Sequence, residues 1–468
     1  MHVHDRIVSQ ERAHVGLAPT AEIDAPTPAY AYGIAVVAAM AGLLFGFDIA
    51  VISGAIIFIR EQFALTELQT EIAVGSLLVG CIAGAMIAGR ASDRLGRRRT
   101  LRLAAILFGI SSIAAGLPHQ LVPFIAARLL AGIATGAASM LAPMYIAENS
   151  PPSLRGRLIS FNQLAIVLGI LLAYLVNWGL ATLGSEGWRW MFAAAAVPAF
   201  ALWVALLFVP ESPRWLMQHG FIDQARAVLT RIGGTQHAEL EAREIVAALA
   251  MERVAGDDLW SRRYRLPLII AVALAVLQQI TGVNTVLYYG SLIFHDHMRG
   301  QTTGSALALN VLVGLVNLLG TLVALSIIDR VGRKPLLLAS SGVMGFALLL
   351  LGGAFRMTPV PSVAIFAIIL CYVFAFAIGL GPAVWVLMAE VFPTHLRGRA
   401  MSIATISLWI ASLALTVTFL SLVTAIGASG TFWLYAVLCL ATFLFVWRVV
   451  PETKGRSLEQ IERMWGQK

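Results

Sequence analysis

Long apolar segments follow one another along almost the whole chain. About twelve of them approach the roughly 20 residues that a helix needs to cross a bilayer. They cover residues 33–59, 72–91, 100–117, 121–145, 160–180, 188–209, 266–294, 305–328, 335–354, 362–388, 400–425 and 431–449. Leu, Val, Ala and Gly fill these segments without strict alternation of apolar and polar positions, which favours helices over a membrane β-barrel. The pattern predicts an all-α membrane protein with twelve transmembrane helices.

Composition and charge placement support a membrane location. Of the 468 residues 59% are hydrophobic and only 12% are charged, and the mean hydropathy is +0.82. The net charge of +8 would also suit a nucleic-acid partner, but the Arg and Lys residues gather in the loops after segments 2, 4, 8 and 10. All these loops fall on one side, so the positive-inside rule places them and both termini in the cytoplasm. We therefore expect a multi-pass protein of the cytoplasmic (inner) membrane whose partner is the lipid bilayer, not a nucleic acid.

One long polar stretch divides the apolar segments into two groups of six. Residues 210–265 have apolar positions at helical spacing, which predicts amphipathic helices on the cytoplasmic surface between halves at 30–209 and 266–449. Residues 1–29 contain no apolar core of a signal peptide, and we interpret them as a disordered cytoplasmic tail. Residues 450–468 form a second cytoplasmic tail.

The two halves repeat each other's motifs. The stretch SDRLGRRRT is echoed by IDRVGRKP 236 residues later, and the Glu of PMYIAE by the Glu of VLMAE 242 residues later. PESPR and PETKG lie 241 residues apart. Three different motifs at nearly one offset indicate an internal duplication.

Together with QQITGVN and GPAVWVLMAEVFP, these motifs resemble the sugar porter family of the major facilitator superfamily, and the pattern is most similar to its bacterial proton-coupled symporters. The resemblance runs from about residue 30 to 455. It implies twelve helices in two pseudo-symmetric halves that move a small molecule across the membrane by alternating access. It also implies transport rather than an enzymatic reaction, and no segment pairs a nucleophile with a base.

Charged clusters beside the cytoplasmic helix ends are candidates for a gate. Both signs of charge converge there, so such networks could latch the cytoplasmic side and break when the halves rock, although anchoring of the topology alone remains an alternative. The resemblance favours gating. The candidate residues are Asp93, Arg94, Arg97, Glu148, Arg155, Glu211, Asp329, Arg330, Arg333, Glu390, Arg397 and Glu452.

Side-chain amides within the apolar segments are candidates for binding a sugar, because one amide offers both a donor and an acceptor to hydroxyl groups. Thr281 and Gly282 could break the helix 266–294 and aim its amides at a central site. An indole such as Trp385, after the helix-disrupting GLGP, can cover the apolar face of a pyranose. For each amide, a hydrogen bond between helices is the alternative. With the positions that the resemblance adds, the candidates are Phe45, Gln163, Gln278, Gln279, Asn284, Tyr288, Asn317, Gly381, Trp385 and Trp409.

Two positions depart from the pattern of similar sugar porters. Ile170 stands where xylose carriers have a glutamine, and Leu408 stands where many relatives have an amide. Both remove hydrogen-bonding capacity from the expected pocket. The substrate therefore stays open between a hexose such as glucose or galactose, a pentose such as xylose, and myo-inositol.

Asp48 is a carboxylate in the middle of the first apolar segment. An ionisable group within a membrane costs at least ~2.5 kcal/mol on insertion scales, so it is functional by default. Arg128 is the only other charge deep inside a predicted segment. We expect the two side chains to pair, either as a static salt bridge or as a switch in which protonation of Asp48 releases Arg128. In the sugar porters this acid resembles the proton-coupling residue of symporters.

Several other interpretations remain. A facilitative sugar or inositol uniporter would use Asp48 and Arg128 only as a structural pair. Drug–proton antiport is disfavoured because the expected pocket gathers amides, and a sugar sensor is disfavoured by the short C-terminal tail. We expect no cofactor besides the proton and no metal site, since the HDH stretch at 295–297 is expected in an exterior loop, where two His are more often hydrated. The transporter is expected to work as a monomer.

The small residues Gly132 and Gly136 form a small-xxx-small pattern that permits close packing between helices in lipid. A phosphate-binding loop is disfavoured at this position because no Lys-Ser/Thr follows.

Overall fold

The structure is a computed structural model that describes residues 28–151, 154–254, 258–297, 302–357, 360–392 and 394–454. Every regular element among these residues is a helix. The first half contains α2 (Pro28–Gln62), α3 (Glu67–Leu95), α4 (Arg97–Ala115), α5 (Leu121–Glu148), α6 (Arg155–Leu180), the 3-10 helix η1 (Ala181–Glu186), α7 (Gly187–Ala194) and α8 (Ala196–Ala205).

A polar linker and a second half follow. The linker carries α9 (Pro213–Gln218), α10 (Ile222–Val254) and the 3-10 helix η2 (Asp258–Trp260). The second half contains α11 (Arg262–Ile280), α12 (Val283–His297), α13 (Thr303–Val331), α14 (Arg333–Arg356), α15 (Ser362–Ile378), α16 (Leu380–Glu390), α17 (Thr394–Thr416) and α18 (Phe419–Val449).

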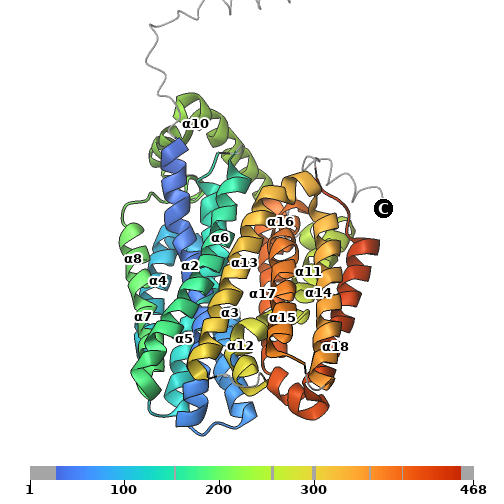
Figure 1. Ribbon diagram of the computed structural model, residues 1–468. Coiled ribbons are helices and arrows are strands. Elements are labelled where there is room, and N and C mark those ends of the chain that lie inside the picture. The colour runs from blue at the N-terminus through green and yellow to red at the C-terminus, as the bar shows by residue number, and fades with distance from the viewer. Residues whose placement is uncertain are drawn as a thin grey trace, which may run out of the picture.

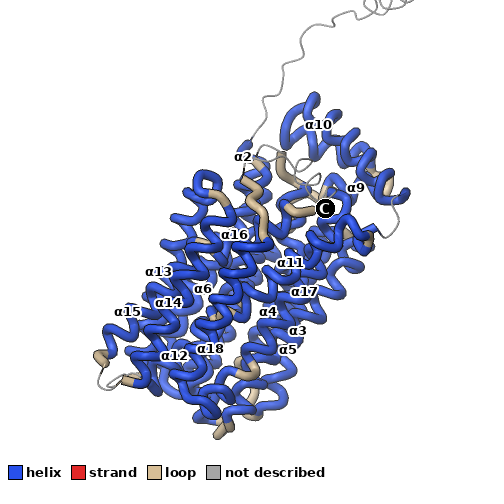
Figure 2. Tube along the Cα trace, turned by 90° about the vertical axis from the view of Figure 1, so that its right-hand side faces the viewer, coloured by secondary structure: helices blue, strands red, loops and turns tan. Residues whose placement is uncertain are grey.

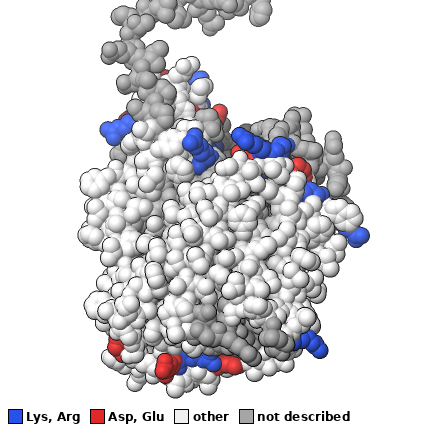
Figure 3. Space-filling model, in the orientation of Figure 1, with Lys and Arg blue, Asp and Glu red and all other residues white. Residues whose placement is uncertain are grey.

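The helices stand side by side in one bundle, with the first half next to the second half (Figure 1). Figures 1 and 2 both place α10 at one end of this bundle, which we call the linker side; the other end is the opposite side. Charged side chains gather at the two ends and leave an uncharged belt between them on the face seen in Figure 3. Such a belt matches the hydrocarbon layer of a bilayer.

Ten helices of the described chain are long and apolar enough to cross a membrane, against about twelve predicted. Two features of the chain explain the difference. The first turns of α4 carry four arginines, which leaves this helix outside the ten. Residues Arg155–Ala205 run without a gap through α6, η1, α7 and α8, so two predicted segments lie in one continuous stretch that turns at Gly184 in η1. The predicted segment 400–425 was wrong in its limits, because α17 ends at Thr416 and α18 begins at Phe419. The loop expected at 295–297 was also wrong, because these residues form the last turn of α12.

Glycines set the distance between α3 and α5. A Cβ at Gly132 would lie 2.1 Å from the carbonyl oxygen of Leu77, and one at Gly136 would lie 2.1 Å from that of Cys81. The close packing predicted from the small-xxx-small pattern is therefore confirmed. This close packing holds α5 against α3 and so sets the orientation of the α5 face that carries Arg128.

Candidate functional site

Asp48 and Arg128 form a buried ion pair within the first half. Arg128 Nη1 donates to Asp48 Oδ1, and the two side chains are 1% (Arg128) and 4% (Asp48) exposed. Thr135 Oγ1 donates to Asp48 Oδ2 at 3.0 Å, and the guanidinium carbon of Arg128 lies 5.2 Å from the ring centroid of Phe192. The predicted pairing is confirmed, whereas its role in proton coupling stays a prediction.

Two helices build this site. Asp48 lies on α2, and both of its partners lie on α5, seven residues apart. Residues at that spacing share one face of a helix, so Arg128 and Thr135 reach the same carboxylate from neighbouring turns. Any displacement of α2 against α5 would therefore change both contacts together.

The apolar segment 266–294 breaks where the sequence predicts. The helix α11 ends at Ile280, Gly282 has φ 91°, and α12 begins at Val283. A Cβ at Gly282 would lie 2.4 Å from the ring of Tyr435, so both the positive φ and the packing require glycine. The break separates Gln278 and Gln279 at the end of α11 from Asn284 in the first turn of α12.

These three amides form a continuous hydrogen-bonded chain across four helices. Gln278 Nε2 donates to the carbonyl oxygens of Leu380 at 2.7 Å and Gly381 at 3.2 Å. Gln279 Nε2 donates to Gln278 Oε1 at 3.1 Å. Asn284 Nδ2 donates to Gln279 Oε1 at 2.5 Å and to the Ser412 hydroxyl at 3.2 Å.

This hydrogen-bonded chain joins α11, α12, α16 and α17. It brings together four of the predicted sugar-binding residues: Gln278, Gln279, Asn284 and Gly381. Hydrogen bonding between helices, the alternative for each amide, is thus present in this structure. A ligand hydroxyl can replace one of these contacts without leaving a buried amide unpaired.

Aromatic residues of the two halves meet beside the amides. The ring centroids of Phe45 on α2 and Trp409 on α17 lie 5.3 Å apart at an interplanar angle of 76°. The indole nitrogen of Trp409 is buried and has no hydrogen-bond partner among the described residues, whereas the buried Tyr288 hydroxyl faces Ser412. The Trp409 indole therefore has a donor that a polar ligand could use.

The remaining predicted residues do not join the amide chain. Gln163 and Trp385 are half-buried and Asn317 is buried. None of the hydrogen bonds described for this part of the chain links them to Gln278, Gln279 or Asn284. Their part in binding a ligand stays a prediction.

On the opposite side, polar side chains join the two halves. Ser53 on α2, Ser291 on α12 and Asn310 on α13 form a buried cluster: Asn310 Nδ2 lies 2.5 Å from Ser291 Oγ and 3.2 Å from Ser53 Oγ. Nearby, Glu71 and Glu67 on α3 bind residues at the start of α18. The halves are therefore closed against each other on this side.

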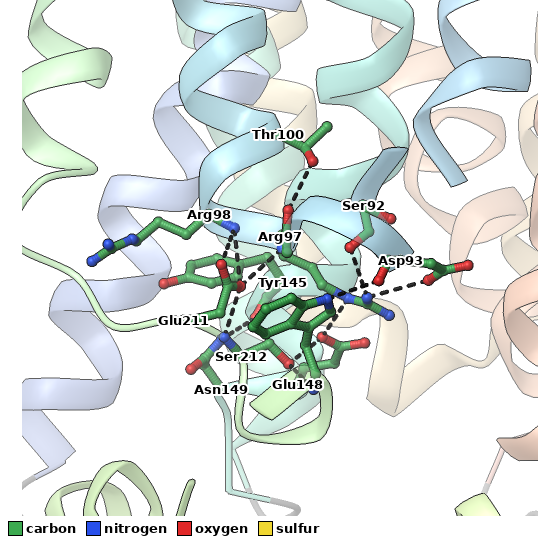
Figure 4. Close-up of polar contacts among 12 residues, drawn as sticks. Ser92, Asp93, Arg97, Arg98, Thr100, Tyr145, Glu148, Asn149, Glu211 and Ser212 are labelled. Atoms are coloured by element: carbon green, nitrogen blue, oxygen red, sulfur yellow. Dashed lines mark hydrogen bonds and ion pairs between the residues drawn. The ribbon is translucent and has the colours of Figure 1, made fainter. Parts of the chain in front are cut away.

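On the linker side, the predicted charged residues form one cluster per half. In the first half, Arg97 donates to Asp93 at 3.2 Å and to Glu148 at 3.1 Å. The Glu211 carboxylate accepts from the backbone amides of Arg97 at 2.8 Å and Arg98 at 3.1 Å, at the start of α4. Figure 4 shows these groups converging from α3, α4, α5 and the stretch that precedes α9.

The second half repeats the arrangement residue for residue. Arg333 contacts Asp329 at 3.0 Å and Glu390 at 2.8 Å. The Glu452 carboxylate accepts from the backbone amides of Arg333 at 3.1 Å and Lys334 at 2.9 Å, at the start of α14. The internal duplication inferred from the motifs thus also appears in the hydrogen bonds.

Some of the predicted gate residues have other partners. Arg155 binds Glu241 of the linker helix α10 at 3.3 Å instead of Glu148. Arg94 and Arg330 are exposed and form none of the ion pairs described here, and the side chain of Arg397 lies outside the described residues. Each described ion pair of the two clusters connects helices of one half. In this structure, which is closed on the opposite side, the clusters therefore hold each half together. Their role as a latch while the opposite side is open stays a prediction.

Comparison with known proteins decides the family. Residues 34–465 match the sequence model of the sugar (and other) transporter family. The arabinose-proton symporter of Bacillus subtilis is 38% identical over 443 residues, which cover 92% of this chain and 94% of the relative. The D-xylose-proton symporter of Escherichia coli is 38% identical over 474 residues, which cover 93% and 96%. This chain belongs to the sugar transporter family.

A solved structure of a related protein shows that this sugar transporter also has the fold of the family. The proton:xylose symporter XylE of the major facilitator superfamily, bound to 6-bromo-6-deoxy-D-glucose, superposes with a TM-score of 0.82 at 37% identity. The match covers 93% of this chain and 99% of that one. The all-α fold and the family that the motifs indicated are confirmed, and the chain is a transporter rather than an enzyme.

Sequence reasoning missed several polar residues of this sugar transporter. Thr135 could have been found, because it follows Arg128 by seven residues on the same helix face. Ser412 and the Ser53–Ser291–Asn310 cluster gave no signal, since isolated Ser and Asn residues are common in transmembrane helices and their partners lie far away in sequence. Glu71 had a weak signal as an acid at the edge of an apolar segment.

Proposed function

We propose that this chain imports a monosaccharide together with a proton by alternating access. The observation that carries the proposal is the buried Asp48–Arg128–Thr135 site on α2 and α5. One helical turn before Asp48, Phe45 of the same helix contacts Trp409 of the other half beside the amide chain. The proton site is thus connected to the amide chain through α2 and the Phe45–Trp409 contact. The related symporters from B. subtilis and E. coli carry arabinose or xylose with protons.

The linker side is then the cytoplasmic side of the inner membrane. The loops on this side carry the Arg-rich motifs, in agreement with the positive-inside rule, and α2 begins and α18 ends on it (Figure 1). Because the halves are closed on the opposite side, the structure corresponds to a conformation that faces inward or is occluded.

Proton coupling follows from the electrostatics of the pair. The Asp48 carboxylate is charged while Arg128 and Thr135 donate to it. When a proton from outside neutralises Asp48, its attraction to the guanidinium is lost and α2 is free to shift against α5. Release of the proton on the inner side restores the pair. One proton that crosses 100 mV supplies about 2.3 kcal/mol, which corresponds to roughly fiftyfold accumulation of sugar.

The sugar would bind between the halves at the amide chain. Its hydroxyls would exchange with the contacts among Gln278, Gln279 and Asn284, and the free donor of the Trp409 indole would add to them. Ile170 and Leu408 are buried apolar residues and offer no hydrogen bond to the sugar. No cofactor other than the proton takes part, and a monomer contains the whole site.

The decisive experiment measures transport by the Asp48→Asn variant in proteoliposomes. We expect the variant to lose accumulation driven by a proton gradient and to keep counterflow of labelled sugar down its own gradient. The control is Asp223→Asn, which removes an exposed carboxylate from the linker. Unchanged accumulation in Asp48→Asn would contradict the proposal, and absence of accumulation in the wild type would make the protein a uniporter.

A panel of glucose, galactose, xylose and myo-inositol identifies the substrate class. Competition of each compound with labelled sugar uptake into vesicles measures its relative affinity. Binding without uptake would indicate a sensor, and displacement by apolar cations rather than by sugars would indicate a drug transporter.

A further inference from the structure

One face of α3 carries a groove that the transport mechanism does not use. The groove has a volume of about 520 Å³ and is lined by Met86, Ile87, Arg90, Ala91, Arg94 and Leu95, all from the last turns of α3 on the linker side. Met86 and Ile87 are more than half exposed. In a membrane, such apolar side chains face lipid, so this groove opens toward the bilayer rather than toward the core.

Among the described residues, no acid forms an ion pair with Arg90 or Arg94. Both side chains are exposed, and neither forms a hydrogen bond or ion pair within the part of the chain that the structure describes. The nearest acid in sequence, Asp93, is turned to Arg97 instead. At a spacing of four residues, two guanidinium groups lie on one helix face about 5–6 Å apart at their Cβ atoms and can bind one phosphate together.

The position along α3 matches the headgroup layer. Arg94 lies in the last turn of the helix and Arg90 one turn earlier, so the long side chains reach the interface while Met86 and Ile87 stay at the depth of the acyl chains. A ligand that fits has a negative group at the helix end and an apolar chain below it.

The second half provides an internal comparison. At the offset of 236 residues, the equivalent face of α13 has Leu322, Val323, Ser326, Arg330 and Val331, and its apolar members are exposed like those of α3. Only position 90 differs in chemical type, because a serine, Ser326, takes the place of Arg90. The Ser326 hydroxyl donates to the carbonyl oxygen of Leu322 at 2.9 Å. The duplicated face therefore has a pair of cations in one half and a single cation in the other.

We propose that the α3 groove binds an anionic phospholipid of the linker-side leaflet. Arg90 and Arg94 hold the headgroup phosphate, and an acyl chain lies along Met86 and Ile87. The equivalent face of α13 lacks the site because a hydroxyl replaces one guanidinium. This inference depends on the membrane location of the bundle and not on proton coupling.

The test measures lipid retention by the full chain in nanodiscs of mixed phosphatidylglycerol and phosphatidylcholine. Native mass spectrometry after release from the discs counts the lipids that stay bound. One Arg near an anionic surface contributes about 1 kcal/mol, so Arg90→Ser should bind phosphatidylglycerol about fivefold more weakly than the wild type. Arg99→Ser is the control, since it removes an exposed arginine from the same side of the bundle but outside the groove.

A second variant keeps the test independent of any loss of stability. Ser326→Arg places a second guanidinium on the α13 face, and we expect it to retain one additional phosphatidylglycerol. Equal retention by Arg90→Ser and Arg99→Ser would overturn the proposal. So would equal retention of phosphatidylcholine and phosphatidylglycerol by the wild type, or no gain in Ser326→Arg.

Discussion

The carboxylate of Glu71 on α3 binds the first turn of α18, although 350 residues separate Glu71 from its partner Ser421. It accepts the Ser421 backbone amide at 2.9 Å and the Ser421 hydroxyl at 2.7 Å. Amides in the first turn of a helix have no partner within the helix, and the positive end of the helix dipole favours an anion there. Since Glu71 is fully buried, this contact joins the two halves on the opposite side.

Replacement of Glu71 by Ala should open the opposite side. The variant loses two hydrogen bonds to a charged acceptor, each worth about 1.5–3 kcal/mol. We therefore expect the ratio of outward-open to closed molecules to rise at least about tenfold. Distances between spin labels at the opposite-side ends of α3 and α18, measured by double electron–electron resonance, report this ratio.

The control for this experiment is Glu61→Ala, which removes an exposed carboxylate at the end of α2. Identical distance distributions for Glu71→Ala and the control would show that the Glu71 contact does not hold the halves together.

The sequence predicts features that depend on local chemistry and misses those that depend on distant partners. The break at Gly282 was predictable because glycine and a β-branched neighbour interrupt an amide-bearing helix. The Asp48–Arg128 pair was predictable because two isolated charges in apolar segments have to find each other. The partners of Glu71 and Arg155 were not predictable, since Ser421 and Glu241 resemble many other surface residues and only the tertiary packing brings them close.

Thr135→Val should change how transport depends on external pH. The variant keeps the volume of the side chain but loses the hydroxyl that donates to Asp48 Oδ2. A hydrogen bond to the charged form of an acid favours that form. Without it, the carboxylate of Asp48 keeps only its contact with Arg128, and the pH profile of uptake should differ from that of the wild type.

Initial rates of sugar uptake over a series of external pH values measure this effect. Thr135→Ser keeps the hydroxyl and should behave like the wild type. A pH profile that is the same in Thr135→Val and Thr135→Ser would exclude the hydroxyl from proton coupling.

Glu186 provides a pH-dependent contribution to stability. It lies in η1 between α6 and α7, and it accepts hydrogen bonds from Arg189 and, at 2.9 Å, from Gln62 at the end of α2. The hydrogen bond from Arg189 lowers the pKa of Glu186 below its ordinary value of 4.5. A lowered pKa in the folded state stabilises the protein above the ordinary value, and the contribution is lost as the pH falls through the lowered pKa.

We therefore expect Glu186→Gln to unfold at a lower temperature than the wild type at neutral pH. The difference should shrink as the pH falls below 4.5. Thermal unfolding in detergent at several pH values measures it. A difference that stays constant through the acid range would assign the effect to packing instead of charge.

Glu211 and Glu452 should stabilise the two halves independently. Each carboxylate accepts backbone amides at the start of a helix, Glu211 at α4 and Glu452 at α14. Loss of such a cap costs typically about 1 kcal/mol, so Glu211→Ala and Glu452→Ala should each lower the free energy of unfolding by roughly that amount. Because each described ion pair of the clusters stays within one half, the double variant should show the sum of the two effects.

Chemical unfolding of all three variants in detergent micelles gives these values. An interaction energy above about 0.5 kcal/mol in the double variant would mean that the clusters are coupled, as a latch between the halves requires.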